Sequence, residues 1–201
     1  IDAVIDGRIK ALWIIGTNPI VSFPDHGALH RGLSSLDFLV VQDGFHPTPT
    51  SALAHRALPA AIWGEKTGTY TNTERRVSKA NRAVAPPGAA RADFDIFLGL
   101  ASALGVRDEL FPGWTTPEDA FTEWRRVSAG RLCDYSGMTY DLIERHGGLQ
   151  WPCPEGDPEP AATKRLYVDG EFETDDGRAV LLPVTWEPFP DQPDANFPFV
   201  L

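Results

Sequence analysis

The polar stretch from residue 59 to residue 77 holds several side chains of this sequence that suit anion chemistry. It is rich in Gly and Thr, and neither a helical nor a strand period persists through it. Stretches of this kind usually run over the surface of a scaffold and carry function. Arg offers a planar fork to phosphate oxygens and Lys a point charge, so the charged residues here suit a ligand that bears pyrophosphate groups. They are Glu65, Lys66, Glu74, Arg75 and Arg76.

A second set of polar side chains follows two predicted strands. Asn18 lies in a Gly-Thr-Asn-Pro turn after one apolar run, and Gln42 and Asp43 close the next. Ligands of open α/β sheets bind at the carboxyl ends of strands. Asn18 offers a donor and an acceptor, and Asp43 can accept two hydrogen bonds, as guanine N1–H and N2–H or a ribose diol require. On spacing alone, ordinary turn chemistry is the alternative, since Asn-Pro and Asp are common after strands.

Other charged residues have plain structural alternatives. Lys66 follows Glu65, so a solvated ion pair between these neighbours is the alternative to phosphate binding. Asp93 begins a predicted helix, where a carboxylate often serves only as a cap. Of the histidines, His46 follows the strand that ends at Asp43 and is the one to test near a site.

Composition and charge exclude several classes of function. The chain has 201 residues, 42% apolar and 23% charged, as soluble globular proteins do. A net charge of −10 argues against a nucleic-acid surface, which needs clustered Lys and Arg. Apolar runs such as residues 11–15 are too short to span a bilayer and no signal peptide is visible, so we expect a cytoplasmic protein without membrane contact. Cys133 and Cys153 have no His at ligand spacing, so we expect reduced thiols and no metal site.

The first half of the chain shows a βαβα pattern. Residues 9–16 and 38–41 are continuous apolar runs, which are typical of buried parallel strands. Residues 27–36 carry Leu at helical spacing, and residues 50–57 are expected to form a short helix. This order predicts parallel strands joined by a right-handed crossover.

Three helices are expected to follow the βαβα segment. Residues 93–104 carry an apolar stripe that ends at Gly105, which suits a C-terminal cap. Thr116 is the expected N-cap of a helix over residues 117–129, with Pro at its first position. A short third helix is expected over residues 139–146.

The last quarter of the chain predicts β structure. Four prolines in residues 152–162 indicate a linker, and residues 165–182 alternate short β runs with Asp-Gly turn signals, as a small β meander would. Residues 197–201 are an apolar run expected to begin another strand. Because the chain begins at Ile1 and its only methionine is Met138, we expect a fragment of a longer polypeptide.

The order and distances of these motifs resemble the molybdopterin oxidoreductase family, in which two molybdopterin guanine dinucleotides hold molybdenum. The likeness is carried by three segments, namely Gly-Thr-Asn-Pro at 16–19, Gln42-Asp43, and Trp-Gly-Glu-Lys-x-Gly-Thr-Tyr-Thr-Asn-x-Glu-Arg-Arg at 63–76. Residues 147–154 are similar to the nitrate reductase and formate dehydrogenase branch, and residues 166–179 to assimilatory nitrate reductases. One departure is His55, where the family usually has Asp, so no role of that acid is carried over.

The resemblance implies a fold and a set of cofactor contacts. The fold would be α/β, a parallel Rossmann-like sheet with flanking helices, followed by helices and the small meander, as part of a larger enzyme. Residues 1–110 would contact the dinucleotide, residues 111–150 would form a helical extension, and residues 151–201 would lead to a further β-barrel domain. The residues that it places on the guanine dinucleotide are Asn18, Gln42, Asp43, Lys66 and Asp93.

The expected function is that of an internal segment of a molybdenum-dependent assimilatory nitrate reductase. The cofactor would be molybdenum bis(molybdopterin guanine dinucleotide), the substrate nitrate, and the partner an electron-donor protein or domain. The family's [4Fe-4S] cluster and molybdenum ligand would lie outside these residues, so the segment alone would be inactive. One alternative is a formate dehydrogenase segment, and another is a non-enzymatic α/β binding protein.

Overall fold

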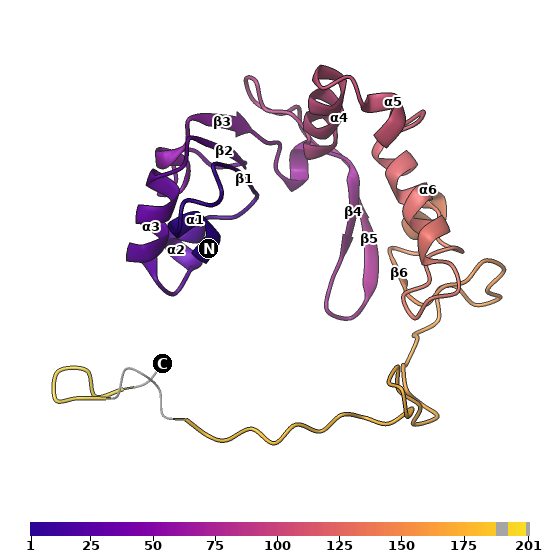
Figure 1. Ribbon diagram of the computed structural model, residues 1–201. Coiled ribbons are helices and arrows are strands. Elements are labelled where there is room, and N and C mark those ends of the chain that lie inside the picture. The colour runs from indigo at the N-terminus through magenta and orange to yellow at the C-terminus, as the bar shows by residue number, and fades with distance from the viewer. Residues whose placement is uncertain (188–192, 200–201) are drawn as a thin grey trace. The chain divides into compact units, whose positions relative to one another are not determined.

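The predicted strands of the first half pair in parallel. A computed structural model of the chain describes residues 1–187 and 193–199 (Figure 1). Strand β1 (Ala11–Ile15) pairs with β2 (Phe38–Asp43), and β3 (Arg56–Pro59) pairs with the other side of β2. Both pairings are parallel, which confirms the orientation expected from the two apolar runs. The carboxyl ends of the strands therefore lie at one edge of the sheet, which we call the carboxyl edge.

Helices pack against one face of this parallel sheet. Helix α3 (His26–Ser34) begins where the Asp25 carboxylate accepts a 2.8 Å hydrogen bond from the backbone N–H of Ala28. Helices α1 (Asp2–Ile5) and α2 (Pro19–Ser22) lie beside α3. One cluster of buried apolar residues joins these helices to the sheet: Val4, Ile14, Leu29, Leu33, Leu36, Leu39 and Val41.

The helix expected over residues 50–57 is not formed. Its first part is a single 3₁₀ turn, η1 (Ser51–Leu53), and its last residues belong to β3. The free edge of β2 explains the difference, because the N–H of His55 donates to Leu39 O at 2.8 Å and Leu39 N–H donates to the His55 ring at 2.9 Å. Pro59 also disfavours a helical conformation at the residue before it.

Part of the polar stretch forms strands instead of a continuous surface loop. After the 3₁₀ turn η2 (Trp63–Glu65), strands β4 (Gly68–Thr71) and β5 (Arg76–Ala80) form an antiparallel hairpin, and β6 (Leu149–Gln150) pairs with β5. Asn72 closes the turn, since its side-chain oxygen accepts from Glu74 N–H and Arg76 N–H at 3.0 Å.

The helices of the second half start and stop where capping chemistry predicts. Helix α4 (Asp93–Ala103) is followed by Gly105 at a φ of 73°, and α5 (Arg107–Leu110) comes next. Helix α6 (Pro117–Ser128) begins after Thr116, and α7 (Tyr140–Arg145) after Thr139. A second buried cluster joins α6 and α7 to the antiparallel sheet: Val77, Phe121, Tyr135, Met138, Tyr140, Ile143, Leu149 and Cys153.

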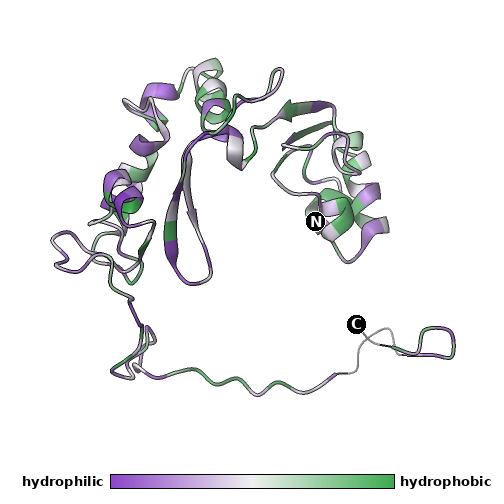
Figure 2. Cartoon of the chain, turned by 180° about the vertical axis from the view of Figure 1, so that it is seen from behind, coloured by the Kyte–Doolittle hydropathy of each residue, from purple (hydrophilic) through white to green (hydrophobic). Residues whose placement is uncertain are grey.

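The meander predicted over residues 165–182 is absent from the described residues. The chain divides into two compact units, residues 1–163 and 164–201, and residues 164–187 and 193–199 contain turns but no strand. The Asp-Gly turn does form, since Gly177 N–H donates to Thr174 O at 3.0 Å. Leu181, however, is 88% exposed, and its hydrophobic neighbours are visible in the extended stretch of Figure 2. A strand needs a partner edge, and these residues have none within the unit as described. The run at 197–201 lies partly outside the described residues, and its described part is not in a strand.

Candidate functional site

The carboxyl edge brings together segments that are far apart in sequence. The backbone N–H of Gly16 donates to Gln42 O at 2.8 Å, which joins the turn after β1 to the end of β2. Gln42 is the fifth residue of β2, and its side chain is fully buried. A buried amide needs polar partners, because an unpaired one loses its hydrogen bonds to water.

Asp93 supplies that partner, and Lys66 joins it. Gln42 Nε2 donates to Asp93 Oδ1 at 2.6 Å, and Lys66 Nζ donates to Asp93 Oδ2. Three of the five residues predicted to contact a cofactor therefore touch one another, and we call Gln42, Lys66 and Asp93 the edge cluster. They come from β2, the loop after η2 and the first turn of α4.

The observed contacts differ from the structural alternatives considered for Asp93 and Lys66, which were a helix cap and an ion pair with Glu65. Asp93 is the first residue of α4, but Ala92 occupies the N-cap position and α4 has no side-chain cap. Lys66 pairs with Asp93 and not with its neighbour Glu65, whose carboxylate instead accepts from the N–H of Ile62 at 2.9 Å. The Lys66 and Asp93 side chains are 23% and 33% exposed, so this pair lies partly open to solvent.

The cluster holds Asp93 ionised. Burial by itself raises the pKa of the Asp93 carboxyl, because it penalises the charged form. The hydrogen bonds from Lys66 and Gln42 and the positive charge of Lys66 outweigh this effect, so the pKa lies below its ordinary value. The edge therefore carries a fixed ammonium–carboxylate pair. Lys66 has three N–H donors, of which one donates to Asp93 and others are left to bind an anion.

One acceptor in the cluster has no partner. Gln42 Oε1 is buried and makes no hydrogen bond within the described part of the chain, although Nε2 of the same amide is paired. Leaving a buried polar atom unpaired costs about 1–3 kcal/mol. Such atoms in a folded protein call for an explanation, and a functional role is one of the usual ones.

Asn18 and Asp43 lie at the same edge, and each accepts hydrogen bonds from other residues of the fold. Asn18 Oδ1 accepts from the Thr50 hydroxyl at 2.6 Å and from the Thr50 N–H at 3.2 Å, so its acceptor is used within the fold. Its amide nitrogen has no partner among the described residues. Asp43 Oδ1 accepts from Phe45 N–H at 3.0 Å, and its second carboxylate oxygen is likewise left over. The side chain of Thr50, fully buried, also accepts from Ile20 N–H, a positioning role that the sequence did not reveal.

The two arginines of the polar stretch face away from this edge. Arg75 donates to Trp151 O at 2.6 Å and stacks over the Trp151 ring, and Arg76 donates to His146 O and Gly147 O. Both therefore fasten the hairpin to residues 146–151. His46 lies beside the Ser51 hydroxyl at 3.0 Å, outside the edge cluster.

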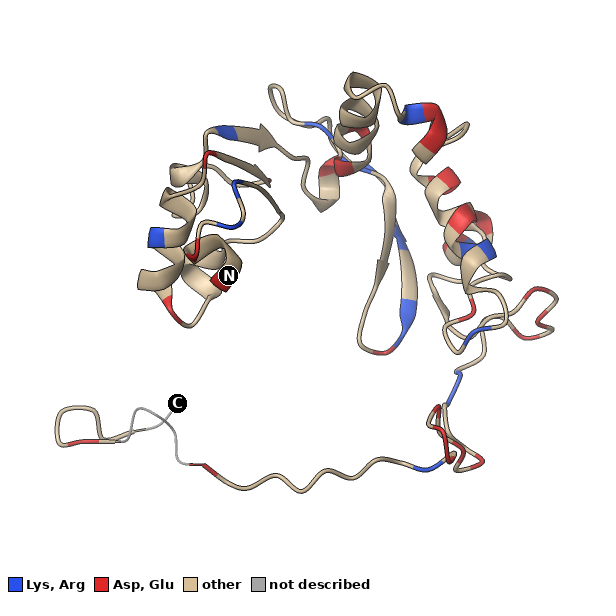
Figure 3. Ribbon diagram, in the orientation of Figure 1, with Lys and Arg blue, Asp and Glu red and all other residues tan. Residues whose placement is uncertain are grey.

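Most acidic residues of the chain lie outside the edge cluster, in which Asp93 is the acidic member. Several acidic residues lie on α5 and α6, shown in red in Figure 3. Among the residues that the structure describes, no group of three or more His, Cys, Asp and Glu side chains is placed to hold a metal ion. Within those same ranges, no helix has the length and apolar character needed to cross a membrane.

Comparison with known families decides what kind of protein carries this edge. The profile of the family described as molybdopterin oxidoreductase matches residues 1–103, the segment that holds the edge cluster. The chain belongs to the molybdopterin oxidoreductase family. Membership implies a molybdenum–pterin cofactor.

Relatives of two kinds are similar to this molybdopterin oxidoreductase chain over nearly its whole length. The nitrate reductase of Synechocystis sp. is 41% identical over 96% of the chain, and the assimilatory nitrate reductase catalytic subunit of Bacillus subtilis is 38% identical over 98%. The F420-dependent formate dehydrogenase subunit alpha of Methanocaldococcus jannaschii is 45% identical over 96%. The chain spans about 27% of the length of each of these relatives.

The fold has a counterpart among solved structures. Acetylene hydratase from Pelobacter acetylenicus matches with a TM-score of 0.56 and 22% identity. The match covers 72% of this chain and 20% of the hydratase. At this identity the likeness concerns the fold alone. It confirms the α/β class, in which a parallel sheet, a small antiparallel sheet and helices combine.

The polar groups at the carboxyl edge fit a polar part of such a cofactor. The unpaired Gln42 Oε1 calls for a donor, and Lys66 retains N–H donors for phosphate oxygens. The backbone around the edge is also open, because a Cβ added at Gly16, Gly64 or Gly68 would meet no atom within 4 Å. Such glycines let a ligand approach the main chain closely.

Proposed function

We propose that this chain is a segment of a molybdenum-dependent nitrate reductase of the assimilatory, cytoplasmic kind, and that its carboxyl edge holds a guanine dinucleotide of the cofactor. The single observation that carries the proposal is the edge cluster. Residues 51 and 27 positions apart in sequence converge there on one carboxylate, at the end of a parallel sheet where ligands of α/β folds bind.

Each side chain of the edge has an assigned task in this proposal. Lys66 donates to a phosphate oxygen while Asp93 fixes its position. Asp43 uses its second carboxylate oxygen, together with the first, to accept from the guanine edge or the ribose hydroxyls. Asn18 donates through its free amide nitrogen. Gln42 holds Asp93 in place through Nε2 and accepts from the cofactor through its unpaired Oε1. The residues of 1–110 thus bind and orient the cofactor, while residues 151–201 lead toward a further domain.

The redox chemistry belongs to the cofactor. Bound molybdenum would supply the two electrons that convert nitrate and two protons to nitrite and water. This segment contributes binding and electrostatics, and we place the [4Fe-4S] cluster, the molybdenum ligand and the contact with the electron donor outside residues 1–201. The same edge would serve any member of the family that uses the dinucleotide form.

A second candidate is a formate dehydrogenase. It is favoured by the Methanocaldococcus jannaschii relative, whose identity of 45% is the higher of the two kinds. Membership of an oxidoreductase family speaks against the non-enzymatic binding protein. Assays of the full-length gene product with nitrate and a reduced dye, and with formate and an oxidised dye, separate the two enzymes.

The dinucleotide contact is tested most sharply by Asp43→Asn. Asn keeps the oxygen that accepts from Phe45 N–H, so the local turn is preserved while one carboxylate acceptor for the ligand is lost. A hydrogen bond to a charged group contributes about 1.5–3 kcal/mol, which corresponds to a roughly 10- to 100-fold weaker retention of the guanine nucleotide. Asp37→Asn is the matched control, because Asp37 is exposed and precedes the same strand at its opposite end.

Lys66→Ala tests the phosphate contact in the same way. Lys79→Ala is its control, since Lys79 also forms an ion pair, with Glu144 at 2.7 Å, but on the antiparallel sheet. The readouts are molybdenum and guanine nucleotide per polypeptide in the purified full-length gene product, alongside its activity. Full cofactor content in Asp43→Asn and Lys66→Ala would falsify the assignment of the edge.

A further inference from the structure

The side-chain amide in the turn after β1 is held in a single orientation. Asn18 Oδ1 accepts hydrogen bonds from the Thr50 hydroxyl at 2.6 Å and from the Thr50 N–H at 3.2 Å. A backbone N–H can only donate, so the atom of Asn18 that faces it must be the amide oxygen and not the amide nitrogen. The Asn18 nitrogen therefore points away from Thr50, on a side chain that is partly open to solvent.

The surroundings of Thr50 fix the direction of its hydroxyl. Thr50 is fully buried, and its Oγ1 accepts from Ile20 N–H at 3.1 Å. Because that bond takes up a lone pair of the oxygen, the hydroxyl hydrogen is left to be donated to Asn18. A hydroxyl that accepts one bond and donates another in a buried place does not rotate to a different partner. Successive bonds of this kind also polarise and strengthen one another.

The backbone of Thr50 is held by its neighbours. Thr48 N–H donates to Ser51 Oγ at 2.7 Å, and Ser51 N–H donates to Thr48 Oγ1 at 3.1 Å. Thr50 itself is the residue before the 3₁₀ turn η1. The loop after β2 thus presents Thr50 to Asn18, which lies 32 positions away in sequence.

An Asn side chain by itself can present either a donor or an acceptor to a ligand. We infer that Thr50 is a positioning residue of the carboxyl edge, which locks the Asn18 amide so that only its N–H groups face the ligand. The part of the nucleotide that lies at Asn18 is therefore a hydrogen-bond acceptor, as a phosphate oxygen is. The inference rests on the proposed function, because it requires a ligand at this edge, and it adds which chemistry that ligand offers at one point.

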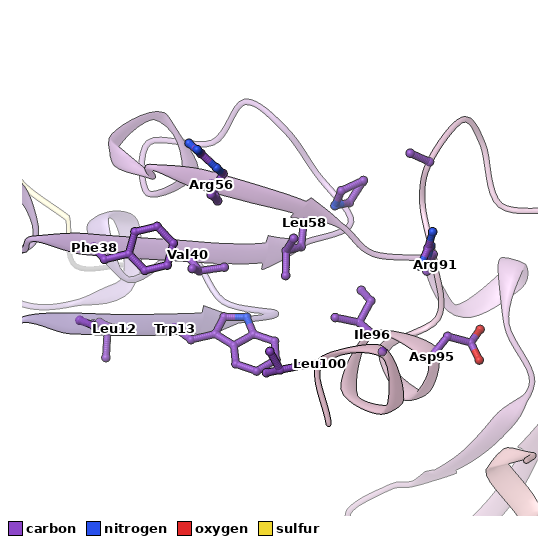
Figure 4. Close-up of a pocket in the computed structure, with 14 residues that line it drawn as sticks. Leu12, Trp13, Phe38, Val40, Arg56, Leu58, Arg91, Asp95, Ile96 and Leu100 are labelled. Atoms are coloured by element: carbon purple, nitrogen blue, oxygen red, sulfur yellow. The ribbon is translucent and has the colours of Figure 1, made fainter. Parts of the chain in front are cut away.

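The cavity drawn in Figure 4 is not the place for this part of the ligand. It holds about 830 Å³ between the strands and α4, and neither Asn18 nor Thr50 lines it. The side chains that line it from the strands are mainly apolar, among them Leu12, Val40 and Leu58. The Asn18 donor is thus available to a group at the carboxyl edge and not to one in this cavity.

Variants of Asn18 and Thr50 in the full-length gene product test the inference. The readout is the guanine nucleotide retained per polypeptide after a fixed dialysis, measured beside the thermal midpoint. Asn18→Asp keeps an oxygen for Thr50 but puts a second oxygen where the nitrogen was, so retention should fall at least about 2- to 10-fold. Thr50→Val loses the hydroxyl and keeps the longer N–H bond, so retention should fall about 2-fold or more. Thr50→Ser keeps the hydroxyl and should retain the nucleotide as wild type does.

A double-mutant cycle separates positioning from general support of the fold. If Thr50 acts through Asn18, Thr50→Val should lower retention in the wild-type background and have no further effect in Asn18→Ala. Thr139→Val is the matched control, because the Thr139 hydroxyl also accepts from a backbone N–H, that of Leu142 at 3.1 Å, but at the start of α7. This control should lower the thermal midpoint and leave retention unchanged.

Four results would overturn the inference. They are full retention in Asn18→Asp, full retention in Thr50→Val, a Thr50→Val effect that persists in Asn18→Ala, and a loss in Thr50→Ser or Thr139→Val as large as in Thr50→Val. If Thr50→Val does not fold, Asn18→Asp decides the outcome, since it keeps the acceptor for Thr50. Full retention in Asn18→Asp together with losses in Asp43→Asn and Lys66→Ala would leave the proposed function standing and this inference refuted. Full retention in all three would refute the proposed function itself.

Discussion

The contact between Gln42 and Asp93 can be tested by removing the acceptor. In Asp93→Ala, the fully buried Gln42 amide loses its only hydrogen-bond partner among the described residues, which costs about 1–3 kcal/mol. The ion pair with Lys66 is also lost, but it is partly exposed and is worth about 0–1 kcal/mol. We therefore expect Asp93→Ala to lower the free energy of unfolding by about 1–4 kcal/mol.

Two further variants separate the terms. Asp93→Asn keeps an oxygen for Gln42 Nε2 and loses only the charge, so it should cost no more than about 1 kcal/mol. Adding Gln42→Leu to Asp93→Ala removes the stranded amide, and since replacing both partners by apolar groups is nearly neutral, this double variant should regain most of the loss.

The assay is urea unfolding followed by tryptophan fluorescence. Trp13, one of the six tryptophans that contribute to this signal, packs on Phe97 of α4 in the region that the cluster joins. The slope of free energy against urea should not change between variants, so that differences in midpoint measure stability. The reasoning is refuted if Asp93→Asn costs as much as Asp93→Ala, because charge and not the buried acceptor would then matter. It is also refuted if Gln42→Leu fails to restore Asp93→Ala.

Three further outcomes follow from the described contacts. The pKa of Asp93 lies below its ordinary value of 3.8, so its charge stabilises the fold fully above that pH and less as pH falls through the folded pKa. The free energies of unfolding of wild type and Asp93→Asn should therefore differ by a constant amount from about pH 7 to about pH 5 and converge in acid. Leu39→Ala should cost about 2–5 kcal/mol in chemical unfolding because Leu39 is fully buried, whereas Leu181→Ala should cost almost nothing. Gly137→Ala should lower the thermal midpoint, because its Cβ would lie 2.2 Å from Pro154 O, and an unchanged midpoint would contradict the packing described there.

The parts of the fold that the sequence predicted are those with a local signal. The apolar runs around Trp13 and Val40 gave the two parallel strands, and Thr116 gave the start of α6. What was missed depends on distant partners. β3 is a strand because β2 offers it an edge, although Arg-Ala-Leu-Pro has little strand character of its own. The runs at 165–182 do have strand character, but the described residues offer them no strand edge to pair with.

The site was predicted unevenly for the same reason. Spacing alone left Asn18, Asp43 and Asp93 as turn or cap residues, and only the resemblance to a family selected them. The structure brings Gln42, Lys66 and Asp93 together, but nothing local in the sequence indicates the bond between Gln42 and Asp93. Contact between these side chains and a cofactor stays a prediction, which the variants test.

The distance along the chain between Gln42 and Asp93 has a consequence for biosynthesis. The two residues are 51 positions apart, and at about 5–20 residues per second a ribosome needs about 3–10 s to travel from one to the other. During that interval the strand end exists without the helix that completes its polar edge. A ligand that recognises the assembled edge therefore distinguishes a finished segment from a nascent one, and the chain itself sets the earliest moment at which it can be loaded.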